Sequence, residues 1–139
     1  MALNAGKHVI CEKPLGMNKK EVEEMIAAAQ ENKRFLMEAL WIRFTPAFKR
    51  VKQLIAEGTI GDIVSYKGNF SLTILPEAAP RLWQLDMGGG ALLDLGVYNL
   101  HYLPALFGAQ SRPEKVSALG TLVNGIDSAS AANVKYGTS

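Results

Sequence analysis

The chain has 139 residues, of which 48% are hydrophobic and 20% charged, and its formal net charge is +2. This length suits one domain of ordinary size, and the composition is that of a globular protein. The small net charge argues against nucleic-acid binding, and no apolar run of about 18 residues could span a membrane. Because the chain has a single cysteine, Cys11, it forms no internal disulfide, and a reducing cytoplasm is the simplest location.

The first forty residues carry the pattern of a parallel β–α–β unit. The segment from His8 to Cys11 is a short apolar strand, an amphipathic helix follows at about residues 18–32, and Phe35 to Leu40 forms a second apolar strand. Asn18 is a suitable helix cap, with Glu21 three residues later as in a capping box. Open parallel sheets bind ligands outside the carboxyl ends of their strands.

Lys13 stands directly after the first strand, in the tripeptide Glu12-Lys13-Pro14. Proline disfavours the helical conformation for the residue before it, so Lys13 is expected to be extended at the end of the strand. A cation in this position suits the recognition or activation of a polar ligand. A surface lysine in a connecting loop would show the same spacing, and the residues alone leave the two interpretations equally open.

Beyond the second strand the pattern changes from parallel to mostly antiparallel. A helix is predicted to start at Pro46, with Thr45 as its cap, and to end at Gly58. Apolar and polar residues partly alternate from Ile63 to Thr73, which predicts a long strand with one packed face. The later predicted elements are a loop at residues 75–87, a helix from the glycines 88–90 to about 107, and strands at residues 116–124 and 129–136 joined by a turn at residues 125–127.

The predicted third helix is apolar nearly all round, which is typical of a buried helix. Asp94, Tyr98 and His101 interrupt its apolar surface, and their spacing places them on one face of a regular helix. A carboxylate beside a phenol and an imidazole could serve acid–base chemistry, whereas a satisfied polar network that ties a sheet to the helix is the competing interpretation. The glycines 88–90 are either a flexible entry to the helix or an approach for a ligand to the backbone.

Two aromatic residues are candidates for an apolar substrate pocket. Trp41 follows the second strand, and Phe70 lies on the long predicted strand. Such residues belong more often to a hydrophobic core than to a binding pocket, so the sequence favours the core over the pocket at these two positions.

Two motifs in collinear order resemble those of the Gfo/Idh/MocA oxidoreductases. Residues 5–15, AGKHVICEKPL, resemble the EKP motif of this family, and residues 88–98, GGGALLDLGVY, resemble its second signature. The resemblance covers essentially the whole chain and implies an α/β piece followed by an α+β piece. Residues 1–40 would be the C-terminal part of a dinucleotide-binding Rossmann domain. Residues 41–139 would be a truncated substrate and dimerisation domain, with a mostly antiparallel sheet and packed helices.

The resemblance implies reversible hydride transfer between a hydroxyl-bearing carbon of a sugar or cyclic diol and NADP or NAD. It is greatest to the branch of the family that oxidises dihydrodiols and D-xylose with NADP. Lys13 and Tyr98 would share the acid–base work, and which of the two accepts the proton stays open. The resemblance also implies that Asp94 orients the pair or the substrate. Glu12, Lys13 and Pro14 would lie beside the nicotinamide ribose, with a cis peptide before Pro14. Trp41 and Phe70 would line the substrate pocket.

The sequence differs from the family pattern because it contains no G-x-G-x-x-G turn to hold a pyrophosphate. We therefore expect a piece of a longer protein, inactive by itself, that lacks the N-terminal phosphate-binding part and the C-terminal end. Its expected partners are the small-molecule substrate and further copies of the chain, which would associate through the sheet. We expect it to bind no metal, nucleic acid or membrane. A non-catalytic binding or dimerising module is the alternative, and the presence of Lys13, Asp94 and Tyr98 together favours the enzyme.

Overall fold

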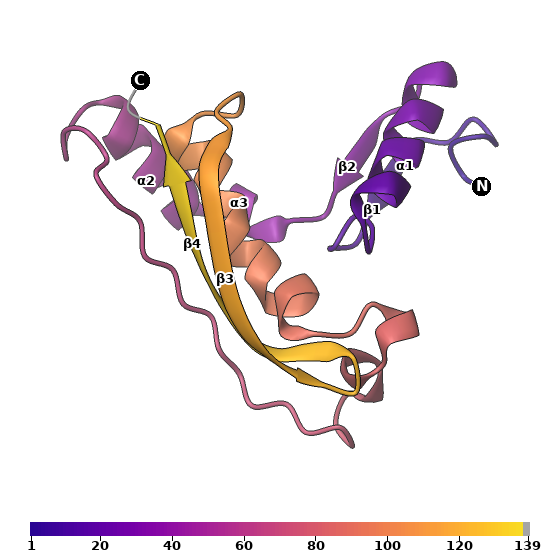
Figure 1. Cartoon of the computed structure of the whole chain (residues 1–139). Helices are drawn as coiled ribbons and strands as arrows, with labels where there is room; N and C mark the ends of the chain where they lie inside the picture. The colour runs from indigo at the N-terminus through magenta and orange to yellow at the C-terminus, as the bar shows by residue number, and fades with distance from the viewer. Residues whose placement is uncertain (138–139) are drawn as a thin grey trace. The chain divides into compact units, whose positions relative to one another are not determined.

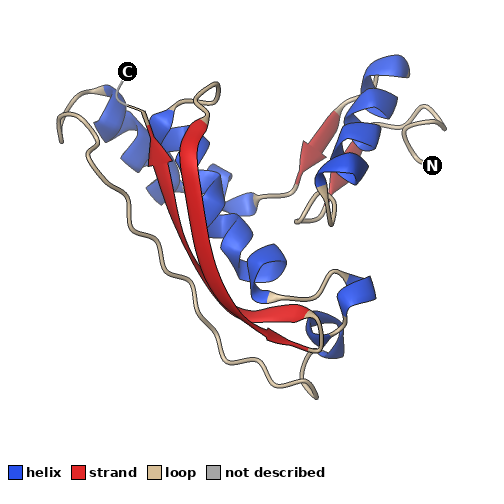
Figure 2. Ribbon diagram, in the orientation of Figure 1, coloured by secondary structure: helices blue, strands red, loops and turns tan. Residues whose placement is uncertain are grey.

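The computed structural model describes residues 1–137 of the chain. The chain folds as two compact units, Met1–Trp41 and Ile42–Ser139 (Figure 1). Helices dominate the middle of the sequence, and the longest strands lie near its end (Figure 2). The predicted order, a parallel α/β piece followed by an antiparallel α+β piece, is confirmed.

The first unit is a single β–α–β crossover. Strand β1 (Val9–Cys11) and strand β2 (Leu36–Glu38) pair in parallel, and helix α1 (Lys19–Glu31) connects them. The predicted helix start is confirmed, since the Asn18 side chain accepts a hydrogen bond from the Glu21 backbone N–H at 3.1 Å. The Glu21 carboxylate in turn accepts from the Met17 backbone N–H at 2.8 Å, so both groups serve the helix N-terminus.

The second unit begins with helices. A short 3₁₀ turn, η1 (Trp41–Phe44), spans the boundary and leads into helix α2 (Pro46–Ala56). Thr45 caps α2 by accepting from the Phe48 backbone N–H at 3.2 Å, and Pro46 occupies its first turn, as the sequence predicts. Phe48 is buried. The later helical elements are the 3₁₀ turns η2 (Pro80–Trp83) and η3 (Leu85–Met87), the π-helical turn η4 (Leu92–Gly96) and helix α3 (Val97–Phe107).

A long antiparallel hairpin ends the described chain. Strand β3 (Pro113–Val123) pairs with strand β4 (Ile126–Tyr136), and the two form a two-stranded sheet. The prediction that the turn lies at residues 125–127 is wrong. Asn124 and Gly125 have φ values of 52° and 84°, which form the tight turn, so Ile126 and Asp127 already belong to β4. An Asn-Gly pair is the favoured two-residue hairpin turn, since both of its residues tolerate positive φ.

The predicted strand from Ile63 to Thr73 is not formed. No backbone–backbone hydrogen bond is made by residues 62–74 within the described chain, and the segment runs as a drawn-out trace in Figure 1. Only part of the predicted packed face is observed: Tyr66 and Phe70 contact α3, whereas Val64 is 94% exposed. Apolar alternation predicts an extended backbone, but a strand also needs a neighbouring edge to pair with.

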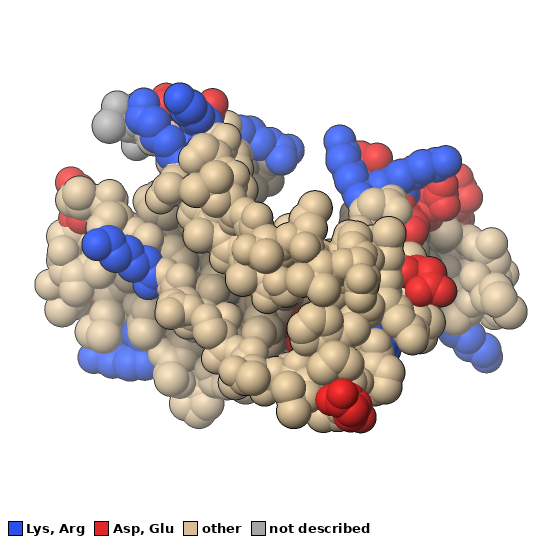
Figure 3. All heavy atoms as spheres, turned by 60° about the horizontal axis from the view of Figure 1, so that its bottom comes forward, with Lys and Arg blue, Asp and Glu red and all other residues tan. Residues whose placement is uncertain are grey.

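Burial in the second unit is lower than the sequence predicts. The third helix is apolar nearly all round, yet Leu92 is 45% exposed and Leu100 is 43% exposed, and every residue of β3 is exposed. Much of the face drawn in Figure 3 carries no charged side chain. The buried apolar side chains of the described residues are Leu3, Ala29, Leu40, Phe48 and Ile126.

None of the helices within residues 1–137 combines the length and the apolar character that crossing a membrane requires.

Candidate functional site

The loop after β1 presents Glu12, Lys13 and Pro14 at the carboxyl end of the parallel strand pair. The peptide bond between Lys13 and Pro14 is cis, as the family resemblance implies. The Lys13 side chain is half-buried, and Glu12 is exposed. The end of β2 fixes this loop, because the Leu15 backbone N–H donates to a Glu38 carboxylate oxygen at 2.9 Å.

Asp94 lies in the π-helical turn η4, with only 13% of its side chain exposed. An Arg81 guanidinium nitrogen lies 3.6 Å from an Asp94 carboxylate oxygen, so a cation accompanies this nearly buried carboxylate. Asp94 also lines a cavity of about 330 Å³, whose other walls include Leu72, Trp83 and Ile126. That volume lies within the range of small-molecule sites, which is about 300 to 1,000 Å³.

Tyr98 lies at the start of α3 and contacts Phe70 of the extended segment, with their ring centroids 5.5 Å apart. A second aromatic pair sits beside it, in which Tyr66 stacks on Tyr102 at 5.5 Å. Burial raises the pKa of Tyr66, and the nearby Tyr102 adds to this shift. The structure thus joins two of the predicted site residues, Tyr98 and Phe70, through direct ring contact.

His101 does not join Asp94 and Tyr98, contrary to the prediction from regular helical spacing. Its ring packs 5.1 Å from Phe48 of α2, and its buried Nε2 has no hydrogen-bond partner among the described residues. Burial lowers the pKa of His101, and the cations of Arg43 and Lys52 lower it further. The π turn between Asp94 and His101 explains the difference, because each residue in it advances the helix by less than the usual angle.

Gly89 and Gly90 are closely packed against their own chain, which neither sequence interpretation expected. A Cβ atom added at Gly89 would lie 2.6 Å from the Leu82 carbonyl oxygen, and one added at Gly90 would collide with the Asp127 carboxylate. Asp127 comes from β4 and accepts a hydrogen bond from the Leu92 backbone N–H at 2.8 Å. The hairpin therefore caps the helix entry, and small residues are required where it does so.

The predicted site residues are divided between the two units. Glu12, Lys13, Pro14 and Trp41 belong to the first unit, whereas Phe70, Asp94 and Tyr98 belong to the second. Within the second unit, Phe70 and Tyr98 are in contact, and Asp94 lies one helical turn before Tyr98. The meeting of both groups in one catalytic site stays a prediction.

Arg81 and Asp127 are the two charged residues beside the site that the sequence reasoning missed. Arg81 lies in the 3₁₀ turn η2, within a segment that the sequence predicts as a loop, and Asp127 is separated from Leu92 by 35 residues. Neither position shows a local pattern that indicates its partner, because both contacts depend on how distant segments meet. A metal site is not indicated, since no group of three His, Cys, Asp or Glu side chains with suitable placement occurs among residues 1–137.

Two family models match successive parts of the chain. Residues 1–40 match an oxidoreductase family with an NAD-binding Rossmann fold, and residues 48–138 match the GFO/IDH/MocA C-terminal domain. A trans-1,2-dihydrobenzene-1,2-diol dehydrogenase from Mus musculus is 42% identical over 137 residues, which are 98% of this chain and 40% of the mouse protein. The closer likeness to dihydrodiol dehydrogenases that the sequence motifs indicate is confirmed by this match.

Solved structures of the same fold have longer chains. An aldose-aldose oxidoreductase from Caulobacter crescentus, complexed with glycerol, matches 97% of this chain and 42% of its own with a TM-score of 0.87 and 28% identity. A 3-ketoreductase from Actinomadura kijaniata, solved with NADP, matches 85% of this chain and 34% of its own with a TM-score of 0.69 and 36% identity. The chain thus spans about 40% of the length of the curated relatives that it matches.

The C-terminal-domain model alone matches well over half of the chain, and the Rossmann model matches the residues that precede it. The chain belongs to the Gfo/Idh/MocA family of oxidoreductases.

Proposed function

We propose that this chain supplies the catalytic part of an NAD(P)-dependent dehydrogenase that oxidises a hydroxyl-bearing carbon of a cyclic diol or a sugar. The observation that carries the proposal is that both family motifs lie on ordered elements of the structure. Glu12-Lys13-Pro14 follows a parallel strand with a cis peptide, and Asp94 and Tyr98 lie on one continuous helical segment. The 42% identity to the mouse dihydrodiol dehydrogenase supports the diol as substrate.

The proposed acid–base work is done by Tyr98 and Lys13. Tyr98 takes the proton of the substrate hydroxyl as the carbon–hydrogen bond breaks, and the ammonium of Lys13 stabilises the phenolate. Asp94, held beside Arg81, orients the substrate hydroxyls by accepting hydrogen bonds. Phe70, which is in contact with Tyr98, and Trp41 provide apolar surface for the ring of the substrate.

The residues after β1 fit one side of a nicotinamide site. Glu12, Lys13 and Pro14 stand outside the carboxyl end of β1, where open α/β sheets bind their ligands. NADP or NAD, when bound, supplies the hydride acceptor. The NADP in the structure of the Actinomadura kijaniata ketoreductase and the preference implied by the diol-oxidising branch favour NADP.

The test uses a chimera in which this chain replaces the matched segment of the mouse enzyme. Lys13→Met and Tyr98→Phe are each expected to lower kcat for a trans-dihydrodiol by at least about 100-fold, the usual contribution of a general acid or base. The dissociation constant for NADPH, followed by fluorescence, should change little. The isolated 139 residues are expected to show no turnover, because they carry no pyrophosphate-binding turn.

Matched controls are Lys20→Met, at an exposed lysine of α1, and Tyr136→Phe, at the end of β4. Both controls should retain the rate of the chimera. Near-normal turnover in Lys13→Met and Tyr98→Phe would refute the assigned roles. A folded chimera that binds NADPH but oxidises neither dihydrodiols nor D-xylose would instead favour the non-catalytic module.

A further inference from the structure

The segment that carries Lys13 is held at both of its ends by the carboxyl end of β2. On one side of Lys13, the Ala39 backbone N–H donates to the Cys11 carbonyl oxygen at 2.7 Å. On the other side, the Leu15 backbone N–H donates to a carboxylate oxygen of Glu38 at 2.9 Å. Glu38 is the last residue of β2 and Ala39 follows it, so two consecutive residues fix the chain before and after Lys13.

The bond from Leu15 to Glu38 depends on the fold of the β–α–β crossover. The two residues are 23 positions apart, and Glu38 comes close to this loop because it pairs with Cys11 in the parallel register. The Leu15 N–H has no backbone acceptor within residues 1–137. Leu15 and Glu38 are both half-buried. A half-buried N–H needs an acceptor, and a carboxylate forms a stronger hydrogen bond than a neutral oxygen does.

The remaining contact of this loop lies farther from Lys13. The Met17 backbone N–H donates to a Glu21 carboxylate oxygen at 2.8 Å, and Glu21 belongs to the first turn of α1. This bond is local and serves the start of the helix. Glu38 therefore differs from Glu21, because it reaches the loop from the neighbouring strand and binds it next to the lysine.

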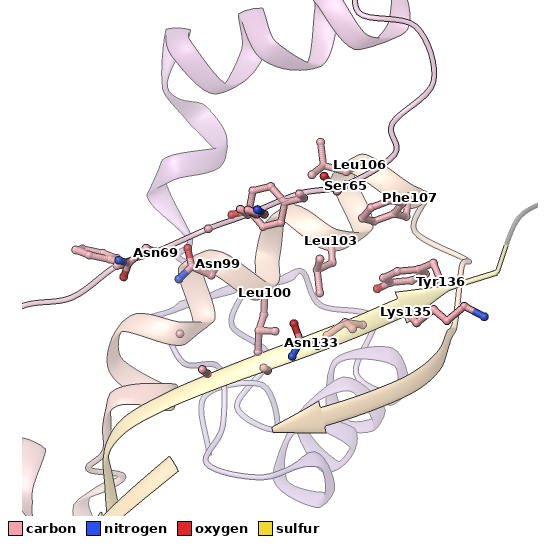
Figure 4. A pocket seen from close by; sticks show the side chains of 18 of the residues that line it. Ser65, Asn69, Asn99, Leu100, Leu103, Leu106, Phe107, Asn133, Lys135 and Tyr136 are labelled. Atoms are coloured by element: carbon pink, nitrogen blue, oxygen red, sulfur yellow. The ribbon is translucent and has the colours of Figure 1, made fainter. Parts of the chain in front are cut away.

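An extended segment of the second unit shows the contrast with a chain that lacks such anchors. Residues 62–72 line a groove opposite β4, and Leu100 and Leu103 of α3 lie between them (Figure 4). Residues 62–74 make no backbone–backbone hydrogen bond in the described chain. Amides without such bonds exchange their hydrogens readily, whereas the amides of Leu15 and Ala39 should be protected.

We propose that Glu38 is a positioning residue for Lys13 in the dehydrogenase reaction. Glu38 acts through the Leu15 peptide, because its hydrogen bond fixes the chain that leaves Lys13. A displacement of about 1 Å in a reacting group can lower a rate about 100-fold. In the proposed reaction the Lys13 ammonium stabilises the phenolate of Tyr98, so release of the loop should lower kcat. This inference rests on the proposed function.

The first test measures turnover of a trans-dihydrodiol by the chimera with the mouse enzyme. Glu38→Ala removes the acceptor and should lower kcat at least about tenfold, since the lysine loses its fixed position. KM for the diol and Kd for NADPH should change little, because binding is not the step that Glu38 serves. Glu38→Gln keeps an oxygen acceptor for the Leu15 N–H and should restore kcat to within about threefold of the unsubstituted chimera.

The matched control is Glu31→Ala, which changes an exposed glutamate at the end of α1. This variant should keep the kcat of the chimera. It removes the same charge from the same unit, so a loss of kcat in Glu38→Ala alone cannot come from the change in net charge.

The second test needs no activity and uses the full 139-residue chain. In Glu38→Ala, hydrogen exchange of the Leu15 amide, followed by NMR, should become at least about tenfold faster because the amide has lost its acceptor. The Ala39 amide, which donates to Cys11, should keep its rate as long as the strand pair is intact. Glu38→Gln should leave both rates close to those of the unsubstituted chain.

Four results would contradict a positioning role for Glu38. A normal kcat in Glu38→Ala would do so, and so would an unchanged exchange rate at Leu15. Equal losses of kcat in Glu38→Ala and Glu38→Gln would assign the carboxylate a direct contact with substrate or cofactor. Equal acceleration at Leu15 and Ala39 would show a general structural role.

Failure of the proposed function gives a different result. An unsubstituted chimera that folds and binds NADPH without turning over the diol would refute the reaction, and the role of Glu38 with it. Turnover that Glu38→Ala leaves intact would refute the role of Glu38 alone.

Discussion

His101 is the one polar side chain that the described chain buries, at 8% exposure, and its Nε2 has no hydrogen-bond partner there. Phe48 and Tyr102 surround its ring, with centroids 5.1 and 5.6 Å away. Such a site accepts the neutral imidazole and disfavours the charged form, because burial removes the water that would solvate the charge. His101 is therefore a structural residue that couples α2 to α3.

The depressed pKa of His101 makes folding stability depend on pH. In the unfolded chain the imidazole titrates near its usual pKa of about 6.5, whereas burial, Arg43 and Lys52 lower the pKa in the folded chain. As pH falls below about 6.5, the unfolded state gains a proton first, so the free energy of unfolding decreases until the folded pKa is passed. Urea unfolding between pH 8 and pH 5 would measure this loss.

The control for that measurement separates the titrating group from the ring contacts. His101→Phe keeps the ring contacts and removes the titrating group, so the pH dependence should become shallower. Phe48→Leu removes a ring contact of His101 but no titrating group, so it should lower the stability and leave a pH dependence in place. An unchanged slope in His101→Phe would show that other groups govern the acid sensitivity.

At the scale of elements, the hairpin stabilises the start of the helical segment η4. The π turn η4 begins where the Asp127 carboxylate accepts the Leu92 N–H, and Gly90 leaves room for that carboxylate. A side-chain cap satisfies a helix N–H that has no partner inside the helix. The turn that carries Asp94 is therefore positioned by a residue of β4, which lies far along the chain.

Removing this cap should destabilise the second unit. Asp127→Ala is expected to lower the free energy of unfolding by about 1 kcal/mol, as loss of a helix cap usually does. The control Asp62→Ala changes an exposed carboxylate and should have little effect. Chemical denaturation followed by circular dichroism would compare the two, and equal losses would argue against a capping role.

A coupling experiment sharpens this prediction. Gly90→Ala should cost more than Gly58→Ala, because both glycines have positive φ but only the added Cβ at Gly90 meets Asp127. The double variant with Asp127→Gly should recover part of the loss, which a double-mutant cycle reports as a coupling energy. Strict additivity of the two substitutions would contradict the close contact.

The whole molecule buries few apolar side chains for its length. Five hydrophobic residues are buried in the described chain, whereas Leu119 is 83% exposed and Leu122 is 71% exposed on the hairpin. A two-stranded hairpin is marginally stable in water without a packed face. The second unit therefore owes its order to a few aromatic contacts and caps rather than to a closed core.

The low burial of apolar side chains predicts that the chain unfolds with weak cooperativity. The isolated 139 residues should bind the dye ANS and unfold over a broad temperature range, because apolar surface is exposed before unfolding. A sharp calorimetric transition without ANS binding by the isolated chain would show that the apolar surface is covered in solution.

Local chemistry in the sequence determined the helix starts and the parallel strand pair. Asn18, Thr45 and Pro46 define helix starts through caps that act within four residues, and the apolar runs around β1 and β2 define a parallel pair. The motifs around Lys13 and Asp94 also indicated the family, since they occur in fixed order. These features depend on neighbours along the chain, which a sequence shows directly.

Only the tertiary structure decided which residues far apart in the sequence come into contact. The π turn that directs His101 away from Asp94, the cap from Asp127 and the lack of a pairing partner beside residues 63–73 depend on distant segments. Side-chain alternation describes a strand's two faces, but its backbone edges carry no sequence signal. For that reason the sequence predicts a strand at residues 63–73, whereas the structure has an extended segment there without a pairing partner.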